Sequence, residues 1–148
     1  MRIRTATAVL CAAAAGIAVG SLPAWLRAAA APSTASSATV HDLMARDLNA
    51  APGKEVRMLT VEYAPGGSSL PHRHNAQVFV YVLQGSLRMQ VQGSPLVVLK
   101  PGDTFYEGPD DVHAVSANAS DTEAARFLVF TVKDKAAPVS SAAQDSRP

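Results

Sequence analysis

Short runs of strand-forming residues, each closed by a glycine or proline turn, constrain the fold of this chain more than any other feature. Val78–Leu83 (VFVYVL) is a continuous apolar run that ends just before Gly85, and residues 87–91 then alternate between apolar and polar. Such runs are typical of strands that bury one or both faces. The expected strands are 56–63, 78–83, 87–92, 96–99, 104–107, 112–116 and 126–132. This succession predicts an all-β domain, a small antiparallel β-barrel that is closed or nearly closed.

The N-terminal segment has the composition of a secretory signal peptide. Arg2 and Arg4 supply a positive start, residues 6–20 are apolar, and Ala28–Ala30 offer a small-residue cleavage site. A membrane anchor is the weaker interpretation, because an apolar run of about 15 residues falls short of the roughly 20 that span a bilayer. We therefore expect residues 1–30 to be cleaved and the mature protein to be periplasmic or secreted, with no membrane association.

The chain that this cleavage would leave has the character of one domain with polar ends. Small and polar residues fill 31–39 and 136–148, which predicts a disordered leader and a disordered tail around a folded domain at 40–135. Residues 41–49 are compatible with one or two helical turns. The single cysteine, Cys11, lies in the signal segment, so the mature domain is expected to hold no disulfide.

The charge of the mature chain excludes one class of partner. The full sequence carries 13 basic and 12 acidic residues. Loss of Arg2, Arg4 and Arg27 leaves ten basic residues against twelve acidic ones, a net charge of −2. Because no basic patch remains, nucleic-acid binding is not expected.

Three of the four histidines form a pattern that indicates a metal site. His72 and His74 lie two apart, and residues two apart on a strand point to the same face. His113 joins them only if the sheet folds back on itself, whereas His41 is expected to be an exposed histidine. Imidazole is the commonest protein ligand for transition metals. Nitrogens that share one ion should converge within roughly 3–4 Å, and at least one ring should donate its other N–H to a carbonyl or carboxylate.

The spacing around these histidines resembles that of the cupin family over about residues 66–118. The first cupin motif is Gly, five residues, His-x-His, three or four residues, Glu, six residues and Gly, and residues 66–85 keep this frame. The second motif is Gly, five residues, Pro-x-Gly, two residues, His, three residues and Asn. Gly102 and His113 keep this spacing, whereas Gly108 and Asp110 stand at the Pro and Gly positions and Asn118 comes one residue late. The resemblance implies a single-domain β-barrel of the cupin or jelly-roll type. It also implies that His72, His74 and His113 are metal ligands.

One departure from these motifs bears directly on the site. Val78 occupies the position of the glutamate that is usually a fourth ligand in the family. Three imidazoles alone leave the charge of the ion uncompensated, which suits an anionic, chelating substrate. Gln77 is a weak substitute ligand, because strand parity turns it away from Val78 unless a β-bulge intervenes.

Two further residues are weak candidates for catalysis. Tyr106 and Glu107 lie shortly before His113, and either could act as a general acid or base if it reached the pocket. Phe79 and Tyr81 are interpreted as core residues of their strand, because large aromatic side chains are most often buried.

The resemblance implies one divalent transition metal, with Fe, Mn, Ni, Cu and Zn all compatible with three imidazoles. The leading hypothesis is a metal-dependent enzyme acting on a small anionic organic molecule, with dioxygenase-like chemistry first and isomerase or lyase chemistry second. Two alternatives stay open: a non-catalytic small-molecule or metal binding protein, and a metal-free cupin barrel. A homodimer is expected, because a chain this small gains buried area by pairing.

Overall fold

The structure, a computed structural model, describes residues 38–143 and consists there of eleven β-strands with no helix. The predicted signal peptide at 1–30, most of the predicted leader and the last five residues lie outside this range. Within it, no helix is long and apolar enough to span a membrane. All strand pairs are antiparallel.

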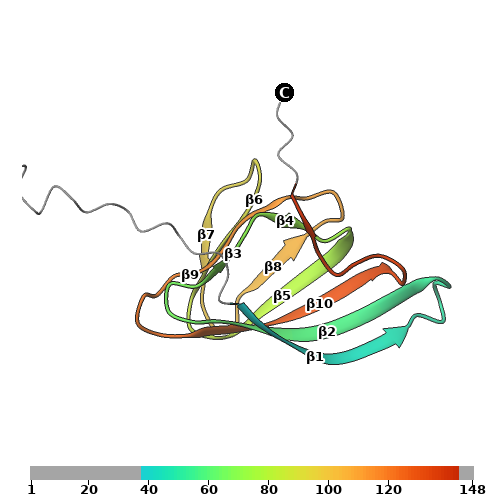
Figure 1. Cartoon of the computed structure of the whole chain (residues 1–148), viewed down its shortest axis with the longest axis horizontal. Coiled ribbons are helices and arrows are strands. Elements are labelled where there is room, and N and C mark those ends of the chain that lie inside the picture. The colour runs from blue at the N-terminus through green and yellow to red at the C-terminus, as the bar shows by residue number, and fades with distance from the viewer. Residues whose placement is uncertain (1–37, 144–148) are drawn as a thin grey trace, which may run out of the picture. The chain divides into compact units, whose positions relative to one another are not determined.

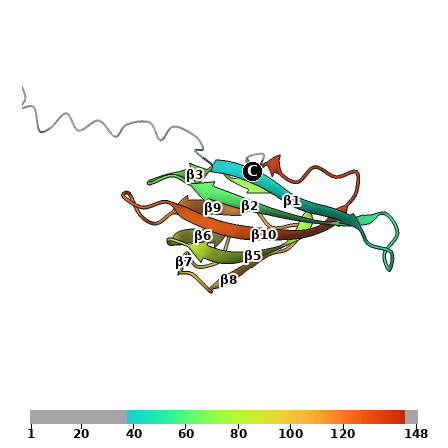
Figure 2. The same cartoon turned by 90° about the horizontal axis from the view of Figure 1, so that it is seen from below.

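A five-stranded sheet forms the larger layer of the domain. Figure 2 shows its strands side by side, and their pairing gives the order β1-β2-β10-β5-β8. The long strands pair over most of their lengths, so this sheet is the more regular of the two. Its members are β1 (Ala38–Asp47), β2 (Lys54–Tyr63), β10 (Ala125–Asp134), β5 (Ala76–Gln84) and β8 (Thr104–Glu107).

A second, six-stranded sheet of shorter strands faces the first (Figure 1). Its order is β11-β4-β9-β6-β7, and β3 also pairs with β9. Its strands are β3 (Ser68–Ser69), β4 (His72–Arg73), β6 (Leu87–Val91), β7 (Val97–Leu99), β9 (His113–Asn118) and β11 (Ser141–Ala142). The predicted all-β, jelly-roll fold class is therefore confirmed. Among the described strands the two sheets stay separate, so the jelly roll is not a continuously closed barrel.

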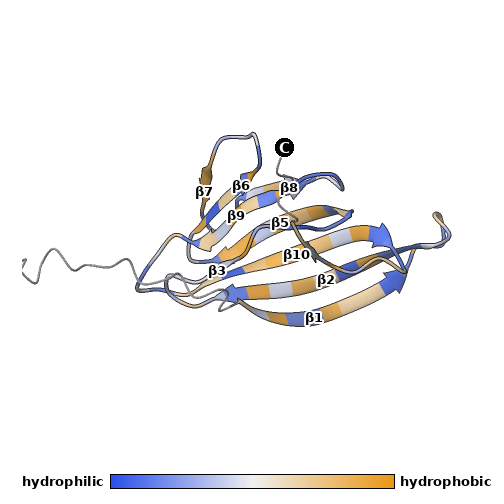
Figure 3. Cartoon of the chain, turned by 45° about the horizontal axis from the view of Figure 1, so that its top comes forward, coloured by the Kyte–Doolittle hydropathy of each residue, from blue (hydrophilic) through white to orange (hydrophobic). Residues whose placement is uncertain are grey.

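The core lies between the two sheets and follows the two-residue period of each strand. In β5 the side chains of Val78, Val80 and Val82 are buried, at most 3% exposed, against inward residues of β2, β6 and β10. In β2, hydrophobic segments are interrupted by hydrophilic ones along the strand (Figure 3). Phe79 and Tyr81 were expected in the core, but they point outward and are 43% and 45% exposed. The continuous apolar run of β5 therefore places apolar side chains on both faces of the sheet, although only the inner face is buried, because successive residues point to opposite sides.

Two segments differ from the sequence expectation at the edges of the domain. Residues 41–49, whose sequence is also compatible with one or two helical turns, belong largely to β1, which pairs with β2 along its length. Sheet pairing outweighs helical propensity here, because a short isolated helix has little stability of its own. Residues 136–143 were assigned to a disordered tail, yet Ser141 and Ala142 pair with Arg73 and His72. The buried Lys133 also donates to the Ala137 carbonyl at 2.6 Å, which ties the start of this segment to the domain.

Candidate metal centre

The structure brings the three histidines of the two motifs together. His72 in β4 and His113 in β9 are direct partners across the strand pair. His74 follows β4, where Asn75 with a φ of 46° turns the chain into β5. One nitrogen from each ring lies within 4.8 Å of the other two. This is looser than the expected 3–4 Å, but opposite ligands on one ion lie about 4.0–4.4 Å apart, so a small shift would suffice.

A β-bulge in β9 aims His113 into the pocket. Gln90 pairs with Val115 while Val91 pairs with His113, so Ala114 has no partner in β6. His113 and Ser116 are three residues apart and would face opposite sides of a regular strand. The extra residue puts both on the inner face, and both line the same pocket. Bulges commonly re-aim side chains next to functional sites in this way.

Two backbone carbonyls determine which nitrogen of His72 and His74 faces the cluster. His72 Nδ1 donates to the Leu70 carbonyl at 2.8 Å, and His74 Nδ1 donates to the Val139 carbonyl at 2.8 Å. A carbonyl can only accept, so both Nδ1 atoms carry the proton. The expectation that a ligand histidine donates its other N–H to a carbonyl is therefore confirmed twice. In the neutral form of each ring, Nε2 is therefore left with an unprotonated lone pair.

These two lone pairs face each other at close range. The Nε2 atoms of His72 and His74 are 3.0 Å apart. A hydrogen bond between them requires one ring to be a cation, and burial lowers the pKa of His72 below its ordinary value of 6.5. His113 is 3% exposed, and neither of its ring nitrogens has a hydrogen-bond partner. The donor set of three converging imidazoles therefore fits a divalent transition metal.

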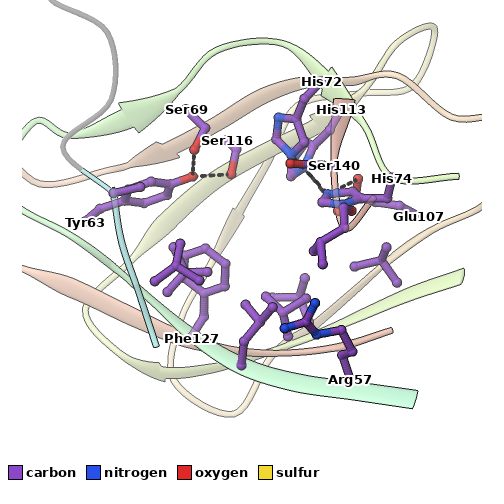
Figure 4. Close-up of a pocket in the computed structure, with 18 of the residues that line it drawn as sticks. Arg57, Tyr63, Ser69, His72, His74, Glu107, His113, Ser116, Phe127 and Ser140 are labelled. Atoms are coloured by element: carbon purple, nitrogen blue, oxygen red, sulfur yellow. Dashed lines mark hydrogen bonds and ion pairs between the residues drawn. The ribbon is translucent and has the colours of Figure 1, made fainter. Parts of the chain in front are cut away.

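A buried carboxylate completes the polar end of the site. Glu107 in β8 is 2% exposed, with Oε1 3.1 Å from His113 Nδ1 and Oε2 3.7 Å from His74 Nε2. From its place in the sequence, Glu107 was considered only as a general acid or base. Figure 4 shows Glu107 beside His74 in the same part of the pocket as the other two histidines.

The other weak candidates do not reach the site. Gln77 is exposed on β5 and pairs in regular register with Val132, so no bulge turns it inward. Tyr106 lies on the opposite face of β8 from Glu107, is 51% exposed and packs against the Phe79 ring at 5.3 Å. Both corrections follow from strand parity, which sends neighbouring residues to opposite faces.

The histidines open onto a cavity of about 320 Å³ between the sheets. Its walls are mainly apolar, with Leu59, Val61, Val80, Phe127 and Val129 among the lining side chains. A concave apolar pocket with a few convergent polar groups is the usual form of a small-molecule site.

The same cavity is lined by a hydroxyl cluster centred on Tyr63. The Tyr63 hydroxyl lies 2.7 Å from Ser69 Oγ and 2.8 Å from Ser116 Oγ (Figure 4). Burial, the largest effect, raises the pKa of Tyr63 above its ordinary value of 10.0. Tyr63 is therefore a neutral, hydrogen-bonded group at physiological pH.

A single arginine, Arg57, lines the same cavity and is not among the site residues predicted from the sequence. Arg57 shares the inner face of β2 with Leu59 and Val61, as the two-residue period requires. Its Nη2 donates to Asp42 Oδ1 at 2.8 Å, whereas its buried Nε has no partner. The signal that could have found it was parity: Arg57 is in phase with Leu59, Val61 and Tyr63, the buried positions on the inner face of its strand.

Comparison with known proteins identifies the family. The cupin domain family matches residues 59–131, which span both histidine motifs. The chain belongs to the cupin superfamily. No curated protein sequence matches it.

Several solved structures share the fold. A recombinant oxalate oxidase in complex with glycolate is 28% identical with a TM-score of 0.53, and the match covers 67% of this chain and 52% of that one. This chain therefore spans about half the length of the oxalate oxidase. A conserved double-stranded β-helix protein from Klebsiella pneumoniae is 20% identical with a TM-score of 0.58, over 78% of this chain and 90% of that one. A cupin-like protein from Thermotoga maritima is 22% identical with a TM-score of 0.57, over 72% and 75%.

Proposed function

We propose that this cupin is a metal-dependent enzyme that holds one divalent transition metal through His72, His74 and His113. The observation that carries the proposal is the pair of Nε2 lone pairs 3.0 Å apart, each locked toward the cluster by a carbonyl on the other side of its ring. Two such lone pairs repel unless a cation lies between them. A bound metal would supply Lewis-acid or redox chemistry at the end of an apolar cavity.

We propose a small organic anion as the substrate, with dioxygenase-like chemistry as the first choice. Arg57 supports the anion, because its buried Nε is a free charged donor on the cavity wall. The oxalate oxidase with 28% identity binds glycolate, described for that protein as a substrate analogue, which is a small carboxylate of this kind. A cavity of about 320 Å³ is large enough for such a molecule.

Two measurements on the purified domain test this function. Elemental analysis should find about one equivalent of a transition metal, and O₂ consumption should rise with one member of a panel of small carboxylic acids and thiols. The variant Arg57→Gln should then raise KM for the active acid by about tenfold or more, as loss of a charged hydrogen bond predicts. Bound metal without any turnover would favour a non-catalytic binding protein, and absence of metal would favour a metal-free barrel.

We further propose that the mature protein is exported and pairs as a homodimer. Export rests on the signal-like composition of residues 1–30. Pairing rests on the outward face of the five-stranded sheet, where the exposed rings of Phe79 and Tyr106 pack with the half-buried ring of Phe130. N-terminal sequencing of the exported protein should begin near Ala31. Light scattering should give twice the monomer mass, and Phe79→Ser should shift it toward the monomer.

A further inference from the structure

The glutamate that the first cupin motif lacks has a neighbour of the same chemistry on the adjacent strand. Val78 in β5 and Glu107 in β8 are direct partners in the antiparallel pair. Side chains of directly opposed residues lie on the same face of a sheet, with Cβ atoms about 4.5–5.5 Å apart. Val78 and Glu107 are both buried and both line the metal pocket. The side chain at position 107 can therefore reach the space that a glutamate at position 78 would have filled.

We propose that Glu107 supplies the fourth protein ligand to the metal and so replaces, from β8, the carboxylate that β5 has lost. The inference rests on the proposed metal binding by the three histidines. It gives the site three neutral imidazoles and one carboxylate, the donor set that the motif would supply if position 78 were glutamate.

The distances between donor atoms agree with ligands of one ion. Two donors at right angles, each about 2.1 Å from an ion, lie about 3.0 Å apart. His72 Nε2 and His74 Nε2 are 3.0 Å apart, and Glu107 Oε1 is 3.1 Å from His113 Nδ1. Oε2 lies 3.7 Å from His74 Nε2. The carboxylate thus approaches two of the three imidazoles at separations close to those of neighbouring ligands.

Hydrogen bonding to the imidazoles does not account for these approaches. His74 Nδ1 carries the proton that it donates to Val139, so in the neutral ring Nε2 has none to offer Glu107. The contact with His113 Nδ1 is short but lacks hydrogen-bond direction, and that nitrogen has no hydrogen-bond partner. A carboxylate buried against imidazole lone pairs is costly unless a cation is shared by all of them.

The charge balance changes with this assignment. A divalent ion with three imidazoles keeps two positive charges, whereas Glu107 reduces the net charge to one. Recognition of an anionic substrate would then depend more on the charge of Arg57 than on an uncompensated charge of the metal. The role of Glu107 becomes that of a ligand in place of the general acid or base considered from sequence.

The test compares Glu107→Gln, Val78→Glu and the double variant, with Glu62→Gln as the control. Glu62 lies on the exposed face of β2, so its variant removes the same charge away from the pocket. Affinity for Co²⁺ is measured by competition with a chelator, and X-ray absorption of the Co²⁺ form counts imidazole and carboxylate donors. Thermal unfolding of each metal-free variant checks that it is folded.

Glu107→Gln should weaken Co²⁺ binding by a factor on the order of 100 and remove the carboxylate donor from the absorption spectrum. The double variant should recover at least tenfold of that loss, because position 78 then supplies the carboxylate from the family's usual strand. Val78→Glu alone should gain little, since a second carboxylate would repel the first. If the double variant does not fold, the absorption spectra of the wild type and Glu107→Gln decide the question alone.

Three outcomes would overturn the proposal. Co²⁺ affinity of Glu107→Gln within threefold of wild type would show that the carboxylate does not bind the ion. If Glu107→Gln binds Co²⁺ more weakly but the absorption spectrum of the wild type shows no carboxylate donor, then Glu107 is a positioning residue for His113. Equal losses of Co²⁺ affinity in Glu107→Gln and Glu62→Gln would show that only the net charge of the protein matters, and not a ligand at position 107. Failure of the wild type to bind any metal would instead refute the proposed function itself.

Discussion

His72 and His113 lie directly opposite each other across the β4–β9 strand pair, although they come from different motifs. Their rings are 5.0 Å apart, and His74 packs edge-on against His72 at 4.7 Å. The cluster is therefore built on paired backbone rather than on loops alone, which limits how far the rings can separate. Sites supported by strands hold their geometry more closely than sites on loops.

Removal of one central ligand should empty the metal centre. His74→Ala deletes the Nε2 that lies 3.0 Å from its counterpart on His72, so the ion would lose a ligand. We expect most of the metal to be lost on dialysis, as measured by elemental analysis. His41→Ala is the matched control, because His41 lies on the exposed edge strand β1. Metal content unchanged in His74→Ala would place the metal elsewhere.

The C-terminal segment should contribute to metal affinity through a main-chain atom. The Val139 carbonyl accepts the proton of His74 Nδ1, and β11 pairs with β4 directly beside the histidines. A chain that ends at Pro138 should bind Co²⁺ about 10- to 100-fold more weakly, because the ring loses the partner that orients it. A chain that ends at Ala143 keeps both contacts and serves as the control. Equal affinity of the two truncated proteins would mean that this carbonyl does not orient His74.

Gly85 should tolerate no side chain. Its φ is +73°, and an added Cβ would lie 2.5 Å from the Ala124 carbonyl oxygen and 2.8 Å from Ala125 Cα. Gly85→Ala should destabilise the domain by about 3 kcal/mol or more, since backbone must move to relieve the contact. Gly93 is the control, because its φ is +85° but an added Cβ would meet nothing within 4 Å. Gly93→Ala therefore measures only the cost of placing a side chain at a positive φ, about 1 kcal/mol of stability. Urea denaturation measures both, and equal costs would show that the contact at Gly85 is relieved without strain.

Tyr63 should make the stability of the domain sensitive to alkaline pH. Burial raises its pKa in the folded state, so the unfolded chain ionises first, near the ordinary value of 10.0. Stability is therefore unaffected by this group below that pH and falls as the pH rises toward the higher folded-state value. Tyr63→Phe should cost about 1 kcal/mol at pH 8 through its lost hydrogen bonds.

The stability difference between the wild type and Tyr63→Phe should be smaller at pH 11 than at pH 8. The wild type loses stability as the unfolded-state tyrosine ionises, whereas phenylalanine has no proton to lose. Urea midpoints of the wild type and Tyr63→Phe at the two pH values measure the change. A difference between the two proteins that stays constant from pH 8 to pH 11 would contradict the role of Tyr63 in this pH dependence.

Strand content and the histidine motifs were predictable because each follows from local rules. The alternation in 87–92 and the apolar run in 126–132 correspond closely to β6 and β10, which end within a few residues of the expected limits. The pairing of His72 with His74 needed only the two-residue period, and His113 needed only the spacing of the cupin motifs. Errors at Phe79 and Tyr81 arose because a continuous apolar run does not say which of its two faces is covered.

The fold class and the three histidines could be predicted without a structure, since hydrophobic period, turn residues and motif spacing are read directly along the chain. The groups that surround the histidines could not. The register that opposes Val78 to Glu107, the bulge that turns His113 inward and the carbonyl of Val139 beside His74 each join segments distant in the chain. No local rule fixes such pairings, because they depend on which strands become neighbours once the two sheets pack.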